Sequence, residues 1–373
     1  ALAKGPGTDR RLVFVFLRGG LDGLAAVPAY GDPDFARKRG ELAIAAPGTA
    51  GGALKLDGMF GLNPLLGEMH KLYASGELLV LHAVATPYRD RSHFDAQNLL
   101  ENGTAKPYGR ESGWLNAALA ELQARGQGGV ALGASVPLVL RGPAPVGSWS
   151  PSVLAAPDPD LLERLGRLYR DDPLFAKPFA AALDAQSLMA AQGDGGMRGE
   201  ARGAPVLALV NAAGKFLTQP DGPRVATIDF GGWDSHASQI GEYSALTRNF
   251  RQLDRAVGAL QAALGPVWKH TAIVVVTEFG RTVAINGSRG TDHGTGAAAF
   301  VLGGAVRGGR VIADWPGLAD RDLHEGRDLR PTTDLRALFK AALVAQLGIG
   351  EAALETRVFP DSRSVRPLEG VFA

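Results

Sequence analysis

The chain has 373 residues, and its 39 basic and 38 acidic side chains leave a formal charge of only +1. Because the basic residues are dispersed as well as balanced, we expect no nucleic-acid partner. No apolar run approaches the ~18 residues of a membrane-spanning helix, and the absence of cysteine excludes disulfides, a thiol nucleophile and a thiolate metal site.

Residues 1–10 are expected to be a flexible N-terminus left after removal of an export signal, because small residues open the chain, as they do near processed signal junctions. Arg10 and Arg11 imitate a twin-arginine signal, but the apolar run 12–17 is too short for one and suits a strand better. Residues 11–373 are expected to form a single domain, because large α/β enzymes often keep this much chain around one sheet.

Six apolar runs rich in β-branched or aromatic residues predict strands: Leu12 to Leu17, Leu78 to Val84, Val136 to Leu140, Val225 to Phe230, Ala272 to Val276 and Ala299 to Leu302. Their nearly continuous apolarity is typical of strands buried on both faces of a parallel sheet. Helical patterns separate them, at 63–75, 93–102, 113–125, 160–170, 174–192, 206–217, 242–264 and 334–348. This alternation predicts a three-layer α/β/α fold with a doubly wound, mostly parallel sheet.

The stretch at about 143–204 has no clear strand pattern, so it is expected to be a helical insertion within the domain. Its Gly-rich interval 192–199 predicts a mobile tip or a lid over the site.

Polar segments follow four of the predicted strands, at 18–23, 89–95, 231–236 and from 277–281 on to 291–294. Open α/β sheets bind ligands just outside the carboxyl ends of their strands. We therefore expect the polar side chains of these segments to converge on one spot.

Two residues after the first predicted strand allow a structural and a functional interpretation. Asp22 lies among glycines, where its carboxylate can bind its own turn or a hard cation. Arg18 can hold an anion in bidentate fashion or close the strand with an ion pair.

Ser92 also has two interpretations. With Asp95 three positions on, it approximates a capping box at the start of a helix. A hydroxyl at a positive helix end also suits a nucleophile that faces an anionic substrate. Its basic neighbours would support that second role: Arg89, Arg91 and His93.

Oxygen and nitrogen ligands for a divalent cation are available in the same segments. The candidates are Asp22, Asp234, His236, Glu278, Asp292 and His293. Glu278 can alternatively pair with Arg281. Neither a dinucleotide fingerprint nor a phosphate-binding P-loop occurs in the sequence, which disfavours nucleotide cofactors.

Five motifs stand out: LRGGLDG at 17–23, PYRDRSHFDAQ at 87–97, GGWDSH at 231–236, TEFGR at 277–281 and GTDHGTG at 290–296. Through them the chain from Arg11 to about Phe359 resembles the family catalogued as domain of unknown function 1501, a sulfatase-like group of exported bacterial proteins. Members usually carry a twin-arginine signal, so the resemblance implies a periplasmic or extracellular location.

The resemblance also implies an alkaline phosphatase-like fold, since the family is grouped with the alkaline phosphatase and sulfatase superfamily. Enzymes of that superfamily hydrolyse phosphate or sulfate esters at one or two metal ions. By this similarity Ser92 matches the nucleophile, and four residues match metal ligands: Asp22, Asp234, His236 and His293. After the strand at 272–276, however, the superfamily places Asp-His, whereas this sequence has Glu278-Phe279, and phenylalanine cannot bind a metal.

The hypothesis from the sequence is a metal-dependent hydrolase that binds one divalent cation, such as zinc, calcium, manganese or magnesium, with Glu278 as a possible further ligand. Ser92, or a water at the metal, would attack a small anionic ester held by Arg18, Arg89 and Arg91. The alternative, favoured by the Glu278-Phe279 departure, is a non-catalytic binding or assembly protein on the same fold.

Overall fold

The computed structural model describes residues 9–122, 128–133, 135–151, 158–172, 174–190 and 205–373. Within these residues a nine-stranded sheet has the order β10-β4-β9-β8-β1-β7-β5-β6, and β11 also pairs with β4. The strands of this sheet are β1 Arg11–Leu17, β4 Leu78–Ala85, β5 Gly129–Leu132, β6 Val146–Trp149, β7 Val225–Phe230, β8 Thr271–Val276, β9 Ala297–Leu302, β10 Arg310–Ile312 and β11 Thr333–Asp334. A separate two-stranded sheet joins β2 Leu54–Lys55 to β3 Gly61–Leu62.

Strand direction decides which loops meet. β1 runs parallel to both β7 and β8, so the loops after these three strands leave the same edge of the sheet. β9 is antiparallel to β8 and β4. The residues that precede β9 therefore lie at the edge where β8 ends, together with the loops that follow the other strands.

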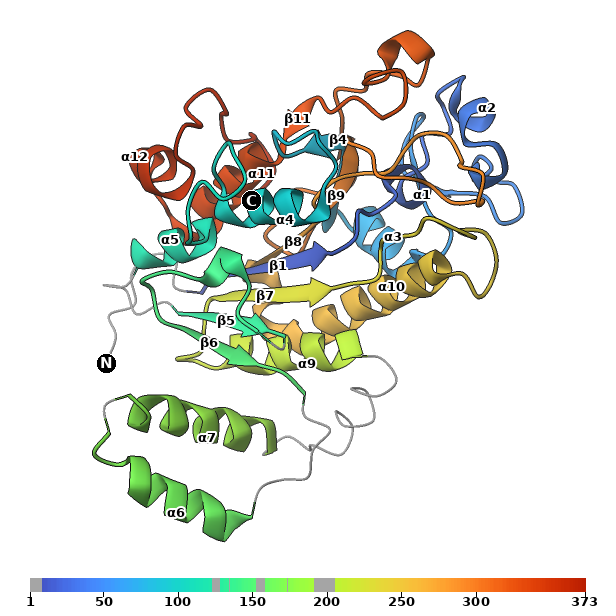
Figure 1. Ribbon diagram of the computed structural model, residues 1–373. Helices are drawn as coiled ribbons and strands as arrows, with labels where there is room; N and C mark the ends of the chain where they lie inside the picture. The colour runs from blue at the N-terminus through green and yellow to red at the C-terminus, as the bar shows by residue number, and fades with distance from the viewer. Residues whose placement is uncertain (1–8, 123–127, 134, 152–157, 173, 191–204) are drawn as a thin grey trace.

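Helices cover both faces of the sheet (Figure 1), with α3, α9 and α10 on one face and α4, α5 and α11 on the other. The helices are α1 Gly23–Ala26, α2 Phe35–Arg39, α3 Gly67–Ala74, α4 His93–Asn102, α5 Trp114–Ala120, α6 Pro159–Tyr169, α7 Ala176–Ala190, α9 Pro205–Thr218, α10 Ala245–Leu264, α11 Leu335–Ala342 and α12 Glu351–Ala353.

Strand β1 shows why the layers form. All seven of its residues are buried, and successive side chains of a strand point to opposite faces. Val13 and Val15 pack into the core beneath α9 and α10, whereas Phe14 and Phe16 pack into the core beneath α4, α5 and α11. The predicted three-layer α/β fold with a mostly parallel sheet is confirmed.

One predicted strand is wrong. Val136 to Leu140 contains a 3-10 turn at Leu138–Leu140 in place of a strand. Pro137 precedes this turn and has no N–H to donate to a neighbouring strand, and the N–H of Val139 donates to Glu101 Oε2 (3.0 Å). The strands in this part of the chain are β5 and β6, which are short. Gly129 opens β5, and the residues of β6 are exposed or half-buried.

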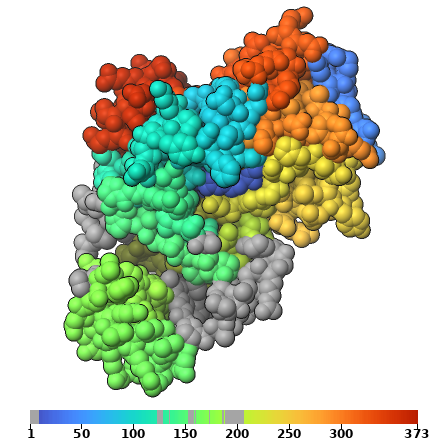
Figure 2. Space-filling view, in the orientation of Figure 1, coloured from blue at the N-terminus to red at the C-terminus, as the bar shows by residue number. Residues whose placement is uncertain are grey.

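The expected insertion at 143–204 contains helices α6 and α7, but it also contains strand β6, which the sequence pattern missed. The two helices pack on each other and project from the body of the molecule as the light-green lobe in Figure 2. The Gly-rich interval 192–199 lies outside the described residues, so the lid interpretation stays a prediction, as do the insertion boundaries. None of the helices described here is long and apolar enough to cross a membrane.

Candidate metal centre

Three loops place three imidazoles around one carboxylate at the carboxyl edge of the sheet. His93 begins α4 after strand β4, Asp234 and His236 follow β7, and His293 precedes β9. Asp234 Oδ1 lies 2.9 Å from His236 Nε2 and 3.3 Å from His293 Nε2, and Asp234 Oδ2 lies 3.5 Å from His93 Nε2. Residues far apart in the sequence thus meet at one spot.

Each of these imidazoles is held at its other ring nitrogen. His93 Nδ1 lies 2.8 Å from Glu278 Oε1, His236 Nδ1 lies 3.1 Å from Asp292 Oδ1, and His293 Nδ1 lies 3.0 Å from the carbonyl oxygen of Arg91. All three partners can only accept a hydrogen bond when the carboxylates are ionised, so each Nδ1 carries a proton, and a ring that holds only this proton presents an unprotonated Nε2. Such an acceptor behind each histidine is typical of metal-binding imidazoles.

The unprotonated nitrogens fit a cation. His236 Nε2 and His293 Nε2 are 3.0 Å apart, so two lone pairs face each other beside the Asp234 carboxylate. His93 Nε2 is buried and has no hydrogen-bond partner among the described residues. One ligand atom from each of His93, Asp234 and His293 lies within 4.8 Å of the others, and imidazole with carboxylate is a donor set that suits zinc and related divalent ions.

Glu278 holds His93 in place. Its Oε1 accepts from His93 and also from Gly19 N (2.8 Å) and Gln97 Nε2 (2.9 Å). Burial alone would raise the pKa of Glu278, but these hydrogen bonds lower it, and the bond to Glu278 raises the pKa of His93. Glu278 therefore contacts Nδ1 of His93, whereas Asp234 lies beside Nε2 of the same ring.

Asp234 is kept ionised by Arg281. Partial burial alone would raise the pKa of Asp234, but the hydrogen bond and the charge of Arg281, whose Nη1 is 2.7 Å from Oδ1, lower it. Glu278 and Arg281 do not form the ion pair considered from the sequence, since each has these other partners. Gly19, at φ +120°, lets the loop after β1 pass close to the backbone of the loop after β7, because a Cβ there would lie 2.4 Å from Asp234 N.

Two neighbouring rings shape the site. Phe279 packs on His93 with ring centroids 4.7 Å apart and on His293 at 5.1 Å. Burial lowers the pKa of His293, and the nearby charges of His93 and Arg281 lower it further. Phe279 thus contributes an apolar wall that favours the neutral form of His293.

The structure does not bring the carboxylate of Asp22 to this cluster. Asp22 caps α1 by accepting from Ala25 N (3.0 Å), and its Oδ2 forms a buried ion pair with Arg39 Nη2 at 2.7 Å. Gln239 Nε2 also donates to Oδ2 (3.2 Å). The carboxylate of Asp22 is therefore bound by Ala25, Arg39 and Gln239, none of which belongs to the histidine cluster.

The three arginines predicted to hold an anion have protein partners too. Arg18 pairs with Glu101 (2.6 Å) and Asp229 (2.8 Å). Arg89 donates to the carbonyl oxygens of Thr86 and Tyr88. Arg91 pairs with Asp328 through Nε (2.8 Å).

The hydroxyl of Ser92 occupies the capping position of α4. It accepts a long hydrogen bond, 3.5 Å, from the backbone N–H of Asp95. The structural interpretation of Ser92 thus has a direct counterpart in the fold, while its role in any reaction stays a prediction.

Asp328 was missed by the sequence analysis. This fully buried carboxylate binds Arg91 Nε (2.8 Å) and Arg327 Nε (2.9 Å). The carbonyl of Arg91 accepts from His293 Nδ1, and Arg327 Nη2 donates to the carbonyl of His293 (2.5 Å). Arg91 also has a φ of 63°, rare for a residue other than glycine. Asp328 therefore fixes His293 from both sides, and no local sequence signal indicates it, because the contact spans segments far apart in the chain.

Comparison with protein families gives one match. The profile described as "Protein of unknown function (DUF1501)" matches residues 78–358. This match confirms the family resemblance seen in the five motifs. No curated protein matches the chain significantly.

Several solved structures are similar to this chain at low sequence identity. The lipoteichoic acid synthase LtaP from Listeria monocytogenes has 10% identity and a TM-score of 0.43, with 95% of this chain and 76% of that chain covered. The zinc complex of the C-terminal periplasmic domain of EptC from Escherichia coli has 8% identity and a TM-score of 0.38, covering 79% and 72%. The phosphonate monoester hydrolase of Agrobacterium radiobacter has 11% identity and a TM-score of 0.38, covering 82% and 70%. Similarity at this level leaves the activity of the chain open.

Proposed function

The chain belongs to the DUF1501 family, and we propose that its three-histidine site binds one divalent cation and hydrolyses phosphate or sulfate esters. One observation carries the proposal: three imidazoles, each held at Nδ1 by an acceptor, direct Nε2 toward the single carboxylate of Asp234. The proposed ligands are His93, Asp234, His236 and His293. Glu278, Asp292 and Arg91 would orient them from behind.

A bound cation would supply Lewis-acid polarisation of an ester oxygen and of the attacking water. Hydrolysis breaks the P–O or S–O ester bond and forms a new bond to the water oxygen. We assign the attack to water rather than to Ser92, because the Ser92 hydroxyl already accepts from Asp95 N as the cap of α4. His293, which stays neutral because burial lowers its pKa, would remain available as a ligand at neutral pH.

Metal binding is the first test. The protein, stripped with a chelator and then dialysed against zinc, manganese, calcium or magnesium, should retain about one equivalent of one of these ions by elemental analysis. His293→Gln and His236→Gln should each weaken binding about tenfold or more, because even loss of a supporting residue costs that much. His70→Gln is the matched control, since His70 contacts Lys55 O outside the site. A protein that retains none of the four ions would contradict the proposal.

Hydrolysis is the second test, with 4-nitrophenyl phosphate and 4-nitrophenyl sulfate as probes. The metal-loaded protein should turn over at least one of them, and His293→Gln should abolish the turnover. Ser92→Ala should cost about 1 kcal/mol of stability, the usual cost of losing a helix cap, and leave turnover intact. Lost turnover in a Ser92→Ala protein that still folds and binds metal would instead make Ser92 the nucleophile.

A specific observation favours the second candidate, a non-catalytic binding or assembly protein. Arg18 and Arg91 are both neutralised by carboxylates, so neither guanidinium is held ready for an anionic ester. Stoichiometric metal binding without turnover of either probe would support this candidate.

Export to the periplasm or beyond the cell rests on the family resemblance alone and is part of the proposal. Fractionation of cells that express the native gene should place the protein outside the cytoplasm. Recovery of the protein only in the cytoplasmic fraction would contradict it.

A further inference from the structure

The histidine cluster lies among more carboxylates than guanidiniums. Five carboxylates belong to the cluster or contact the residues that hold it: Asp234, Glu278, Asp292, Asp328 and Glu325. Three guanidiniums do the same: Arg281, Arg91 and Arg327. Carboxylates and guanidiniums are both ionised near pH 8, so this set carries two excess negative charges. One divalent cation would balance them.

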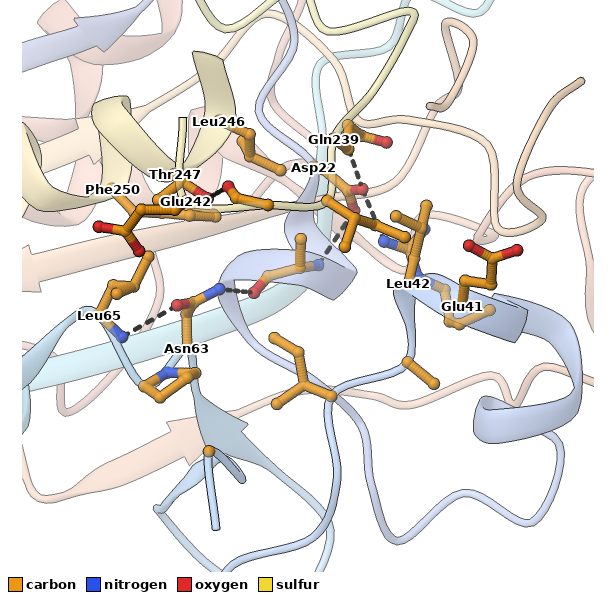
Figure 3. A pocket seen from close by; sticks show the side chains of 18 of the residues that line it. Asp22, Glu41, Leu42, Asn63, Leu65, Gln239, Glu242, Leu246, Thr247 and Phe250 are labelled. Atoms are coloured by element: carbon orange, nitrogen blue, oxygen red, sulfur yellow. Dashed lines mark hydrogen bonds and ion pairs between the residues drawn. The ribbon is translucent and has the colours of Figure 1, made fainter. Parts of the chain in front are cut away.

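Each guanidinium of this set already has a carboxylate partner. The pairs are Arg281 with Asp234 (2.7 Å), Arg327 with Asp328 (2.9 Å), and Arg91 with Asp328 (2.8 Å) and Glu325 (2.5 Å). The Asp22 carboxylate adds no net charge from the loop after β1, because Arg39 neutralises it at 2.7 Å (Figure 3). The positive charge offered to an anionic ester would therefore come from the bound cation, and the surrounding carboxylates balance that cation.

This balance bears on the charge of the substrate. An anion loses hydration when it enters a protein site, and the cost grows with its charge unless cations offset it. A phosphate monoester carries nearly two negative charges at pH 8, because its second pKa is about 6. Sulfate monoesters and phosphate diesters carry one. A site whose charges are balanced compensates the second negative charge poorly.

We propose that the site selects esters with a single negative charge, that is, sulfate monoesters or phosphate diesters, over phosphate monoesters. The inference rests on the proposed function, since it concerns the same metal site. The basis of the selection is the excess of carboxylates around the three imidazoles and not a contact with one particular group of the ester.

Equilibrium binding tests the selection without turnover. The protein, loaded with the divalent ion that it retains, is titrated by calorimetry at pH 8 with methyl sulfate, dimethyl phosphate and methyl phosphate. At least one of the two singly charged ligands should bind about tenfold more tightly than methyl phosphate, and the tighter of the two identifies the ester class. Methyl phosphate binding as tightly as both, or no saturable binding of either singly charged ligand, would overturn the inference.

Turnover separates this inference from the proposed function. The probes 4-nitrophenyl sulfate, bis(4-nitrophenyl) phosphate and 4-nitrophenyl phosphate share a leaving group, and KM should be highest for the last. The expected order of binding without turnover of any probe would contradict the hydrolase alone. Turnover together with tightest binding of methyl phosphate would contradict the charge selection alone.

A variant that shifts the balance tests its electrostatic cause. Glu325→Gln removes one negative charge beside Arg91 and should strengthen anion binding. The factor for methyl phosphate should be about the square of that for methyl sulfate, because Coulomb energy is proportional to the charge of the ligand. Added salt should reduce both factors, since Glu325 is 63% exposed.

Glu41→Gln is the matched control and should change neither affinity. Glu41 is 62% exposed and pairs with Arg289 at 2.7 Å, but it lines the pocket in Figure 3, which none of the cluster histidines lines. Equal factors for methyl phosphate and methyl sulfate in Glu325→Gln, or no change in either, would show that the charges around the cluster do not select the ligand.

Discussion

Asp22 and Asp234 follow neighbouring strands of the same sheet, yet their surroundings differ completely. The side chain of Asp22 is 2% exposed and is closed off by Arg39, which is itself 0% exposed. The side chain of Asp234 is 42% exposed and is surrounded by imidazoles and one arginine. Position after a strand thus brings a carboxylate to the edge of the sheet, but the partner that arrives from elsewhere in the chain decides whether it becomes structural or stays available to a ligand.

The closed region around Asp22 includes a third polar residue. His82 is fully buried in β4, its Nε2 lies 3.0 Å from the carbonyl of Val27 just after α1, and its Nδ1 accepts from Ala83 N. Burial lowers the pKa of His82 to about 4. In this region the Asp22 carboxylate and both ring nitrogens of His82 have hydrogen-bond partners, whereas in the histidine cluster His93 Nε2 has none among the described residues.

The largest expected effect is on the closed region. Arg39→Met leaves the Asp22 carboxylate buried without its cation, which should reduce the free energy of unfolding by about 3–5 kcal/mol in urea denaturation. Arg37→Met is the control, because Arg37 lies on the same helix but its side chain is 61% exposed. The double variant Arg39→Met with Asp22→Asn should recover most of the loss. A double variant no more stable than Arg39→Met would show that the ion pair is not what closes this region.

The next effect is a dependence of stability on pH. His82 has a lowered pKa in the folded protein. Between pH ~6.5 and about 4, His82 is therefore protonated in the unfolded chain but stays neutral in the folded chain. The contribution of neutral His82 to the free energy of unfolding is complete above pH ~6.5 and is lost as the pH falls. The loss is at most about 3 kcal/mol at pH 4, from 1.36 kcal/mol per pKa unit. The difference in unfolding free energy between the native protein and His82→Gln should therefore shrink with acidification. A difference that stays constant over this range would mean that His82 takes up its proton at the same pH in the folded and the unfolded protein.

The smallest expected effect is on metal binding at the histidine cluster around Asp234. Asp328→Asn should weaken divalent-metal binding about tenfold, since residues that orient metal ligands typically contribute that much. The reason is that Asp328 holds both arginines that contact His293. Asp322→Asn is the control, because Asp322 lies nearby in the chain and pairs only loosely with Arg321, at 3.8 Å. Equal metal affinity in both variants would show that Asp328 does not contribute to metal binding through His293.

Local signals in the sequence were enough for much of the fold. The apolar runs that became β1, β4, β7 and β8 are long and buried on both faces, and helix α4 has the predicted bounds, His93 to Asn102, because Ser92 caps its start and Gly103 ends it at φ 72°. Strands β5 and β6 escaped detection, since a strand of four residues that opens with glycine or lies half-exposed has no clear periodicity.

The sequence by itself determined the layered fold, the family and the set of polar segments at the strand ends, because strand burial and motif spacing are properties of neighbouring residues. Only the tertiary structure decided which of these polar residues gather in the histidine cluster and which are closed off by other protein groups. It placed Arg39 on Asp22, 17 positions away, and Glu278 behind His93, 185 positions away. It also placed Asp328 behind His293, 35 positions away, by way of Arg91 and Arg327. Hydrogen bonds and ion pairs act over about 3 Å in space whatever the separation in sequence, so the partner of each site residue is set by how the loops cross the edge of the sheet.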